Sequence, residues 1–110
     1  GSHSWSHVNL AALQGEELER ELRMPADWLG GRFPDRYLPW LSYPYGLSTP
    51  ATARAVRDAG YSAAVRVVGG WLDPRREVDR FALPRHNMPR GLSERGFMLR
   101  ASGIGNRGVR

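Results

Sequence analysis

The sequence predicts an α/β fold with parallel strands. Helical and extended patterns alternate along its 110 residues, and proline, glycine or a capping residue separates one segment from the next. Alternation of this kind is typical of sheets whose parallel strands are joined by right-handed crossovers. Such folds place their functional sites at the carboxyl ends of the strands. The residues that follow each predicted strand are therefore the first candidates for a site.

The first helix is expected over residues 14–23, which read QGEELERELR. Leu18 and Leu22 lie four apart on one face, and the acidic residues precede the basic ones, as the helix dipole favours. Pro25 is expected to kink or end this helix near residue 23. A further turn over residues 26–29 is predicted before the glycine pair that follows.

Two strands are expected on either side of a second helix. Residues 37–43 (YLPWLSY) are aromatic and apolar, and residues 62–68 (SAAVRVV) are rich in valine. Between them, Thr49 offers a hydroxyl cap and a proline stands at the first helical position. Gly60 is predicted to end this helix in a left-handed conformation.

The remainder is predicted to contain less regular structure. Residues 69–79 are expected to form a loop, and residues 81–88 (FALPRHNM) an extended segment interrupted by a proline. A last short helix is predicted to begin at Ser93 or Glu94 and to end at Gly103.

The composition excludes several classes of protein. Hydrophobic residues make up 41% of the chain and charged residues 25%, which is typical of a globular domain. No cysteine is present, so disulfides and thiolate metal sites are excluded. No apolar run approaches the roughly 18 residues of a membrane span. The net charge is +5 and all 16 basic residues are arginine, but acidic residues lie between them, so we expect no nucleic-acid partner.

The chain opens GSHSWSHVNL, with His3 and His7 four residues apart. This spacing lets two imidazoles face one direction on a helical turn, as in many zinc sites. No glutamate follows His3, so the pattern is not the H-E-x-x-H motif. The pair alone leaves two other interpretations open: the remnant of a cleaved expression tag, or two solvated histidines.

Two further segments contain candidate residues. Residues 43–46 (YPYG) are expected to form a tight turn that leaves a strand, where backbone amides can stabilise an oxyanion. In residues 83–86 (LPRH), a proline precedes a cation and a titratable imidazole that is suited to acid–base work. Taken singly, the two segments are better explained as a structural turn and a structural histidine.

In order and spacing, these segments resemble the carboxy-terminal part of a polysaccharide deacetylase of the NodB-homology type, the carbohydrate esterase family 4-like group. GSHSWSHVNL and the following GEELEREL match its second motif, and WLSYPYG matches its "YPyG" strand end. RDAGYSAAV and FALPRHNM match later segments, so the resemblance covers residues 1–103. Ser4, His7 and Leu10 continue the motif from His3 in register, which favours the motif over a tag.

The resemblance implies metal-dependent hydrolysis of N-acetyl or O-acetyl groups on a polysaccharide. His3 and His7 match the two histidines that hold a divalent metal, which we expect to be zinc. Tyr45 matches the residue whose backbone N–H holds the oxyanion. The residues expected to bind substrate are those of the turn: Tyr43, Pro44, Tyr45 and Gly46. The side chains of the two tyrosines are expected to line the sugar groove.

Three further assignments follow from the same resemblance. His86 is a candidate general acid, and Arg85 is a second candidate catalytic residue in the same segment. The LPRHN sequence departs from the family's more usual leucine–histidine pattern. The resemblance therefore supports the role of general acid for His86 less strongly. Trp5, between the two histidines, is expected to pack beneath the site.

The family's first motif, an aspartate pair that supplies the catalytic base and the third metal ligand, has no match in this chain. The expected fold is therefore a partial (β/α) barrel of the polysaccharide deacetylase type with its first strands missing. Residues 1–103 are expected to be the carboxy-terminal part of the domain and residues 104–110 a tail. Two histidines alone should bind zinc weakly, and hydrolysis without the base should be slow or absent.

Two alternatives from other classes remain open. One is a non-catalytic relative that binds glycans through the Tyr43 and Tyr45 groove, and the other is an arginine-rich nucleic-acid binder. The sequence does not distinguish among chitin, peptidoglycan, poly-N-acetylglucosamine, an exopolysaccharide and acetylated xylan as substrate. A glycan substrate would favour the cell envelope or a secreted protein.

Overall fold

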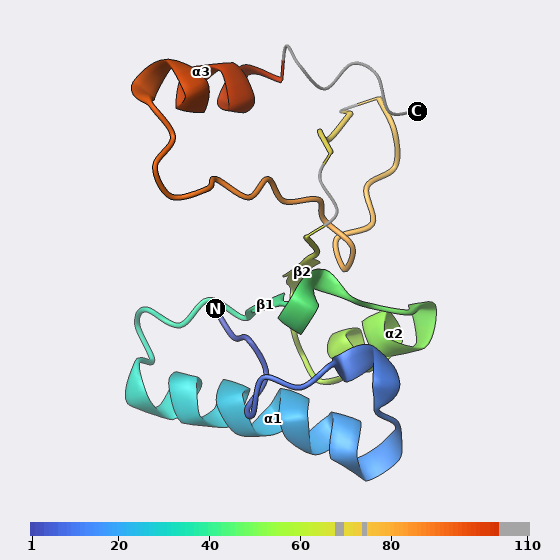
Figure 1. The fold of residues 1–110 in the computed structure, drawn as a ribbon. Coiled ribbons are helices and arrows are strands. Elements are labelled where there is room, and N and C mark those ends of the chain that lie inside the picture. The colour runs from blue at the N-terminus through green and yellow to red at the C-terminus, as the bar shows by residue number, and fades with distance from the viewer. Residues whose placement is uncertain (68–69, 74, 104–110) are drawn as a thin grey trace.

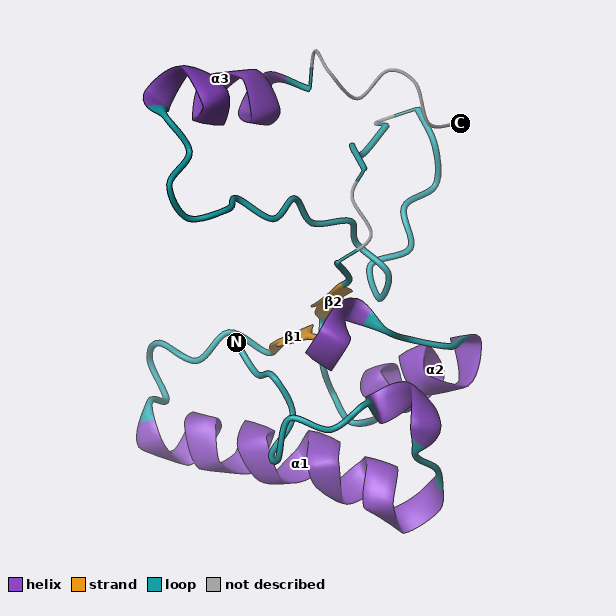
Figure 2. Cartoon of the chain, viewed as in Figure 1, coloured by secondary structure: helices purple, strands orange, loops and turns teal. Residues whose placement is uncertain are grey.

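A computed structural model describes residues 1–67, 70–73 and 75–103. The order of its elements agrees with the predicted alternation of helices and parallel strands (Figures 1 and 2). The elements are η1 (Leu10–Ala12), α1 (Gly15–Arg32), β1 (Trp40–Ser42), η2 (Pro44–Gly46), α2 (Pro50–Asp58), β2 (Ala63–Val65) and α3 (Glu94–Ser102). Within the described residues, no helix has the length and apolar character that crossing a bilayer requires.

The sheet is small and parallel. β1 and β2 pair over three residues each. Ser2 forms a parallel bridge to Leu41 on one side, and Leu83 forms a parallel bridge to Val65 on the other. Four chain segments therefore run in the same direction. The residues that follow each of them emerge at one edge of the sheet, which is where an α/β fold places its site.

Both strands are shorter than predicted. The expected strand over residues 37–43 is reduced to β1, and the one over residues 62–68 is reduced to β2; Val68 lies outside the described residues. The hydrogen-bond ladder continues for one more step, because the Tyr43 N–H donates to the Val65 carbonyl at 3.1 Å. Strand length is set by the partner segments, and apolar composition alone does not show where they end.

Helix α1 runs through Pro25, so the alternative that the helix ends near residue 23 is wrong. The helix also passes the glycine pair and ends at Arg32. A proline removes one helical hydrogen bond. Pro25, however, is buried on the same face as Leu18 and Leu22, at positions i, i+4 and i+7. Packing of this face against the core stabilises the helix through the proline.

The predicted caps of α2 and α3 are confirmed. The Thr49 hydroxyl accepts a hydrogen bond from the Thr52 N–H at 3.1 Å, and the Ser93 hydroxyl caps α3 in the same way. Gly60 and Gly103 follow the two helices with φ of 89° and 71°, a conformation that costs glycine little. Local chemistry therefore sets these helix ends.

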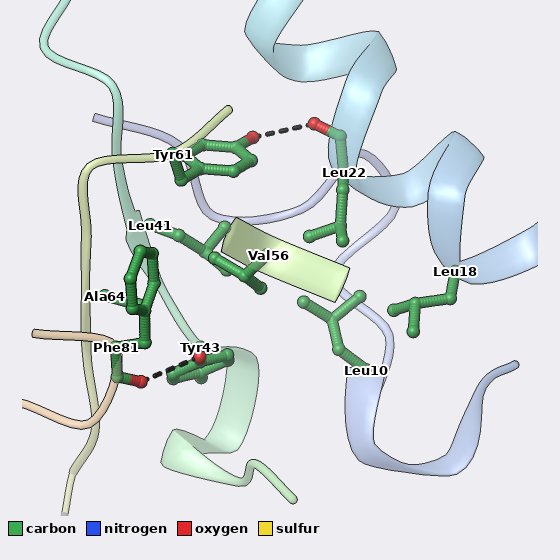
Figure 3. Packing of buried hydrophobic residues seen from close by; sticks show 9 residues of the cluster. All are labelled: Leu10, Leu18, Leu22, Leu41, Tyr43, Val56, Tyr61, Ala64 and Phe81. Atoms are coloured by element: carbon green, nitrogen blue, oxygen red, sulfur yellow. Dashed lines mark hydrogen bonds between the residues drawn. The ribbon is translucent and has the colours of Figure 1, made fainter. Parts of the chain in front are cut away.

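The core lies between the sheet and the helices α1 and α2 (Figure 3). Leu41 of β1 and Ala64 of β2 face these helices, whereas Trp40 is exposed on the opposite face. The buried cluster comprises Leu10, Leu18, Leu22, Leu41, Tyr43, Val56, Tyr61, Ala64 and Phe81. Helix α3 lies apart from α1 and α2, on the other side of the sheet (Figure 1), and has no buried residue.

Candidate active site

His3 and His7 lie together at the carboxyl edge of the sheet. Their ring centroids are 4.8 Å apart with an interplanar angle of 66°, and both side chains are exposed. The helical turn expected from their spacing is not what joins them. Ser4 and His7 have φ of 60° and 58°, so the loop between them is left-handed at two non-glycine residues. Each such residue costs about 1–2 kcal/mol.

A backbone carbonyl of β1 fixes the orientation of His3. Its Nδ1 lies 2.6 Å from the Ser42 carbonyl oxygen. A carbonyl only accepts hydrogen bonds, so Nδ1 must carry the proton. In the neutral ring this leaves the Nε2 lone pair available for a metal, the arrangement typical of histidine ligands.

Two side chains hold the loop between the histidines. The Ser4 hydroxyl accepts a hydrogen bond from the His7 N–H at 2.9 Å. The Glu21 carboxylate, from α1, accepts hydrogen bonds from Trp5 and Ser6. Partial burial acts to raise the pKa of Glu21, but the hydrogen bonds from Ser6 and Trp5 outweigh it and hold this pKa below its usual value.

The YPYG turn lies beside the histidines. Tyr45 has φ 58° and ψ 3° within η2, and its ring centroid is 5.0 Å from that of His7. Its side chain is 61% exposed. Gly46 has φ 69°, and a Cβ placed on it would overlap the side chain of Val67. Only glycine fits this approach, so the turn is held closely against the end of the β2 segment.

Tyr43 does not line a groove, which corrects the expectation for its side chain. It is 0% exposed, and its hydroxyl donates to the Phe81 carbonyl at 2.9 Å (Figure 3). Burial, with a smaller contribution from Asp79, raises its pKa to about 12. The physical reason is strand alternation, because Leu41 and Tyr43 point to the same, inward face.

Two neighbours of Tyr43 in the turn, Pro44 and Gly46, are also buried. Their expected part in binding substrate stays a prediction. The left-handed backbone at Tyr45 breaks the strand alternation and turns that side chain outward. Tyr45 is therefore the member of the turn that presents its side chain to solvent.

Arg85 shares a pocket with His3. Its Nη1 donates to the Ser42 hydroxyl at 3.0 Å, and its Nε is buried with no partner among the described residues. The pocket has a volume of about 470 Å³, and its lining includes His3, Ser42, Trp40 and Arg85. Ser42 therefore contacts both residues: its hydroxyl accepts a hydrogen bond from Arg85, and its carbonyl oxygen orients His3.

The structure places His86 beside Trp71 and Trp5 at the surface. The role of His86 as general acid stays a prediction. The structure pairs His86 with Trp71, at 4.9 Å between ring centroids, and its Nε2 is buried without a partner among the described residues. No contact joins it to the two N-terminal histidines within the part of the chain that the structure describes. Trp5 is 47% exposed, so it does not pack beneath the site; the loop turns it outward.

Within residues 1–67, 70–73 and 75–103, no third histidine, aspartate or glutamate joins His3 and His7 in a group that could hold a metal. Asp73 and Asp79 instead accept hydrogen bonds from the nearby Arg75 and Phe81 backbone. Sequence reasoning missed the part played by Glu21. One signal was available, because Glu21 lies in the GEELEREL segment that matches the family's second motif.

These features define an α/β fold with a histidine pair, an exposed tyrosine turn and an arginine at one sheet edge. The chain belongs to the polysaccharide deacetylase family, whose sequence model matches residues 1–64. The resemblance that the motifs indicated is thereby confirmed. No curated protein matches the sequence significantly.

A solved structure supports the fold. The Streptococcus pyogenes deacetylase PplD, in complex with acetate, is similar with a TM-score of 0.75 and 17% sequence identity. The match covers 87% of this chain and 41% of the PplD chain. At this identity the similarity establishes the fold, and this chain spans about two fifths of the length of that deacetylase. The expected partial barrel agrees with this coverage.

Proposed function

We propose that this chain takes part in metal-dependent removal of acetyl groups from a polysaccharide, with His3 and His7 as two of the metal ligands. The observation that carries the proposal is the histidine pair, whose rings are 4.8 Å apart while the Ser42 carbonyl orients one of them. Membership of the polysaccharide deacetylase family supports the reaction class. Imidazole is a ligand that suits zinc, so zinc is the metal we assign.

The described residues fit such a metal in part. Both imidazoles are exposed, and His3 keeps its Nε2 free for coordination. We propose that residues 1–103 are the later part of a deacetylase domain and that residues preceding Gly1 in a longer protein supply the aspartate ligand and base. The coverage of 41% of the PplD chain supports this assignment.

Tyr45, Arg85 and His86 have separate roles in the proposed reaction. When bound, a divalent cation supplies Lewis-acid polarisation of the acetyl carbonyl and lowers the pKa of water. The Tyr45 N–H donates to the oxygen on which negative charge develops, and the Tyr45 ring lies against the sugar. Arg85 adds positive charge at the same edge, and His86 is a candidate proton donor to the leaving group.

The reading frame upstream of the codon for Gly1 is tested first, because the proposal requires an aspartate pair there. The encoded protein is then assayed for acetate release from N-acetylated glucosamine oligomers, peptidoglycan and acetylated xylan, with zinc or with a chelator. We expect zinc-dependent release that His3→Ala and His7→Ala each abolish. Release that survives either substitution contradicts the assignment.

The same assay separates the enzyme from its alternative. Retention on a glycan column without acetate release, in a protein that has the aspartate pair, supports the glycan-binding relative. His86→Ala tests the proton donor separately: a fall in kcat with unchanged zinc affinity is expected if His86 protonates the leaving group. An unchanged kcat overturns that role.

A further inference from the structure

Hydrogen bonds, not packing, determine the shape of the loop that carries the two histidines. Residues 5–7 are exposed, so little buried area holds them in place. Ser4 and His7 nevertheless adopt left-handed backbone conformations that non-glycine residues avoid. A loop of this kind persists only when its surroundings hold it there.

Glu21 provides that hold. One carboxylate oxygen, Oε2, accepts hydrogen bonds from the Trp5 N–H at 3.0 Å and the Ser6 N–H at 2.9 Å. The other, Oε1, accepts from the Ser6 hydroxyl at 2.6 Å. Three donors from two adjacent loop residues therefore converge on one side chain. Hydrogen bonds to an ionised carboxylate are shorter and stronger than those between neutral groups.

The carboxylate is itself held by a rigid element. Glu21 is next to Leu22, which is 0% exposed in the core, and three residues from Leu18, which is 7% exposed. The Leu22 carbonyl also accepts a hydrogen bond from the Tyr61 hydroxyl at 2.7 Å (Figure 3). Glu21 thereby fixes the position of the exposed loop relative to the buried core.

We propose that Glu21 is a positioning residue that sets the distance between His3 and His7, acting through the backbone of Trp5 and Ser6. Glu21 touches neither histidine, and it has no proposed contact with metal or substrate. Its consequence for metal binding rests on the proposed function. Its consequence for the geometry of the loop does not, because the hydrogen bonds are present without a metal.

Two substitutions and a matched control test the proposal in the full chain. Glu21→Ala removes all three acceptor contacts. Glu21→Gln keeps the shape and one acceptor oxygen for the two N–H groups, while the Ser6 hydroxyl can turn to accept from the amide. Glu19→Ala is the control, because Glu19 lies on the same helix and, among the described residues, pairs with the exposed Arg23 at 2.6 Å.

Zinc titration by calorimetry is one readout. We expect Glu21→Ala to weaken zinc binding by about 10- to 100-fold, as is typical when a group that orients metal ligands is lost. Glu21→Gln should recover part of this loss, and Glu19→Ala should bind zinc as the unsubstituted chain does. Equal zinc affinity in Glu21→Ala and the unsubstituted chain overturns the proposal.

Imidazole NMR spectra of the metal-free chain are the second readout. The chain has three histidines, so the signals of His3 and His7 can be compared with those of His86 as an internal reference. We expect Glu21→Ala to shift or broaden the first two and to leave His86 unchanged. Unchanged His3 and His7 signals overturn the proposal.

The two readouts separate two kinds of failure. If the unsubstituted chain binds no zinc, the reason can be the aspartate ligand that the proposal places outside this chain, and the metal-free spectra then decide whether Glu21 positions the loop. If all three histidine signals collapse in Glu21→Ala, the change is global unfolding. In that case Glu21→Gln decides: its weaker, neutral hydrogen bonds should shift the signals of His3 and His7 and leave His86 unchanged. Spectra and zinc affinity identical to those of the unsubstituted chain overturn the proposal.

Discussion

Residues 1–67 and the described residues from 70 onward are stabilised by different means. The first region contains both paired strands, α1, α2 and every member of the buried cluster except Phe81. In the second region α3 has no buried residue, and Phe97, Met98 and Leu99 are 47%, 62% and 57% exposed. The family match, over residues 1–64, coincides with the packed region.

This difference teaches where the candidate site obtains its rigidity. His3, His7 and Tyr45 all belong to the packed region, which fixes them through β1, η2 and α1. Arg85 and His86 come from the second region, which is tied to the first through a few contacts. One of these contacts is the Leu83 bridge to Val65, and another is the Tyr43 hydroxyl bond to Phe81.

The largest effect on stability is expected from a leucine substitution in the first region, with a leucine substitution in the second region as the comparison. Leu22→Ala should lower the free energy of unfolding by about 3 kcal/mol, because it leaves a cavity in the core. Leu99→Ala removes a side chain that is 57% exposed and should change it by less than about 0.5 kcal/mol. Urea unfolding of both variants measures the difference. Equal losses would mean that α3 packs as tightly as α1, and the contrast between the regions would be lost.

A smaller effect is expected where the two regions meet. Tyr43→Phe removes the hydroxyl that donates to the Phe81 carbonyl and should cost about 1–2 kcal/mol of unfolding free energy. Tyr45→Phe is the matched control, because that side chain is exposed, and should change stability by less than about 0.5 kcal/mol. A larger loss in Tyr45→Phe than in Tyr43→Phe would reverse the assignment of core and surface within the turn.

Alkaline pH provides a second measurement of the same contact. Burial raises the pKa of Tyr43 from 10.0 to about 12, so the folded state favours the neutral phenol. The resulting stability is complete below pH 10 and is lost as the pH rises from 10 to 12. Tyr43→Phe should lose less stability over this range than the unsubstituted chain. Tyr61, whose pKa burial also raises to about 12, retains its share in both.

The smallest effect is expected at acid pH, within the packed region. Hydrogen bonds from Ser6 and Trp5 outweigh burial and lower the pKa of Glu21 from 4.5, so the folded state favours the carboxylate. Its stability is present above pH 4.5 and is lost as the pH falls through the lowered pKa. Urea midpoints between pH 3 and 6 should therefore fall more steeply in the unsubstituted chain than in Glu21→Gln. Parallel curves would show that the carboxylate contributes nothing to folding.

Much of the fold and part of the site could be predicted from the sequence. Thr49 and Ser93 predicted the starts of α2 and α3, because a capping side chain forms its hydrogen bond within the first turn of the helix. The alternation of segments predicted the parallel sheet, and the two histidines were found as a pair. The continuation of α1 through Pro25 was not predicted, because it depends on burial of the proline ring against distant residues.

The sequence by itself determined the local features: the caps of α2 and α3, the turn chemistry and the residue types that stand at the carboxyl ends of strands. Only the tertiary structure decided that Tyr43 points into the core while Tyr45 points outward, and that Glu21 reaches the loop of the histidines. The physical reason is the range of the interactions. Caps and turns involve neighbours in the chain, whereas the contacts of Tyr43 with Phe81 and of Glu21 with Ser6 join residues 38 and 15 positions apart.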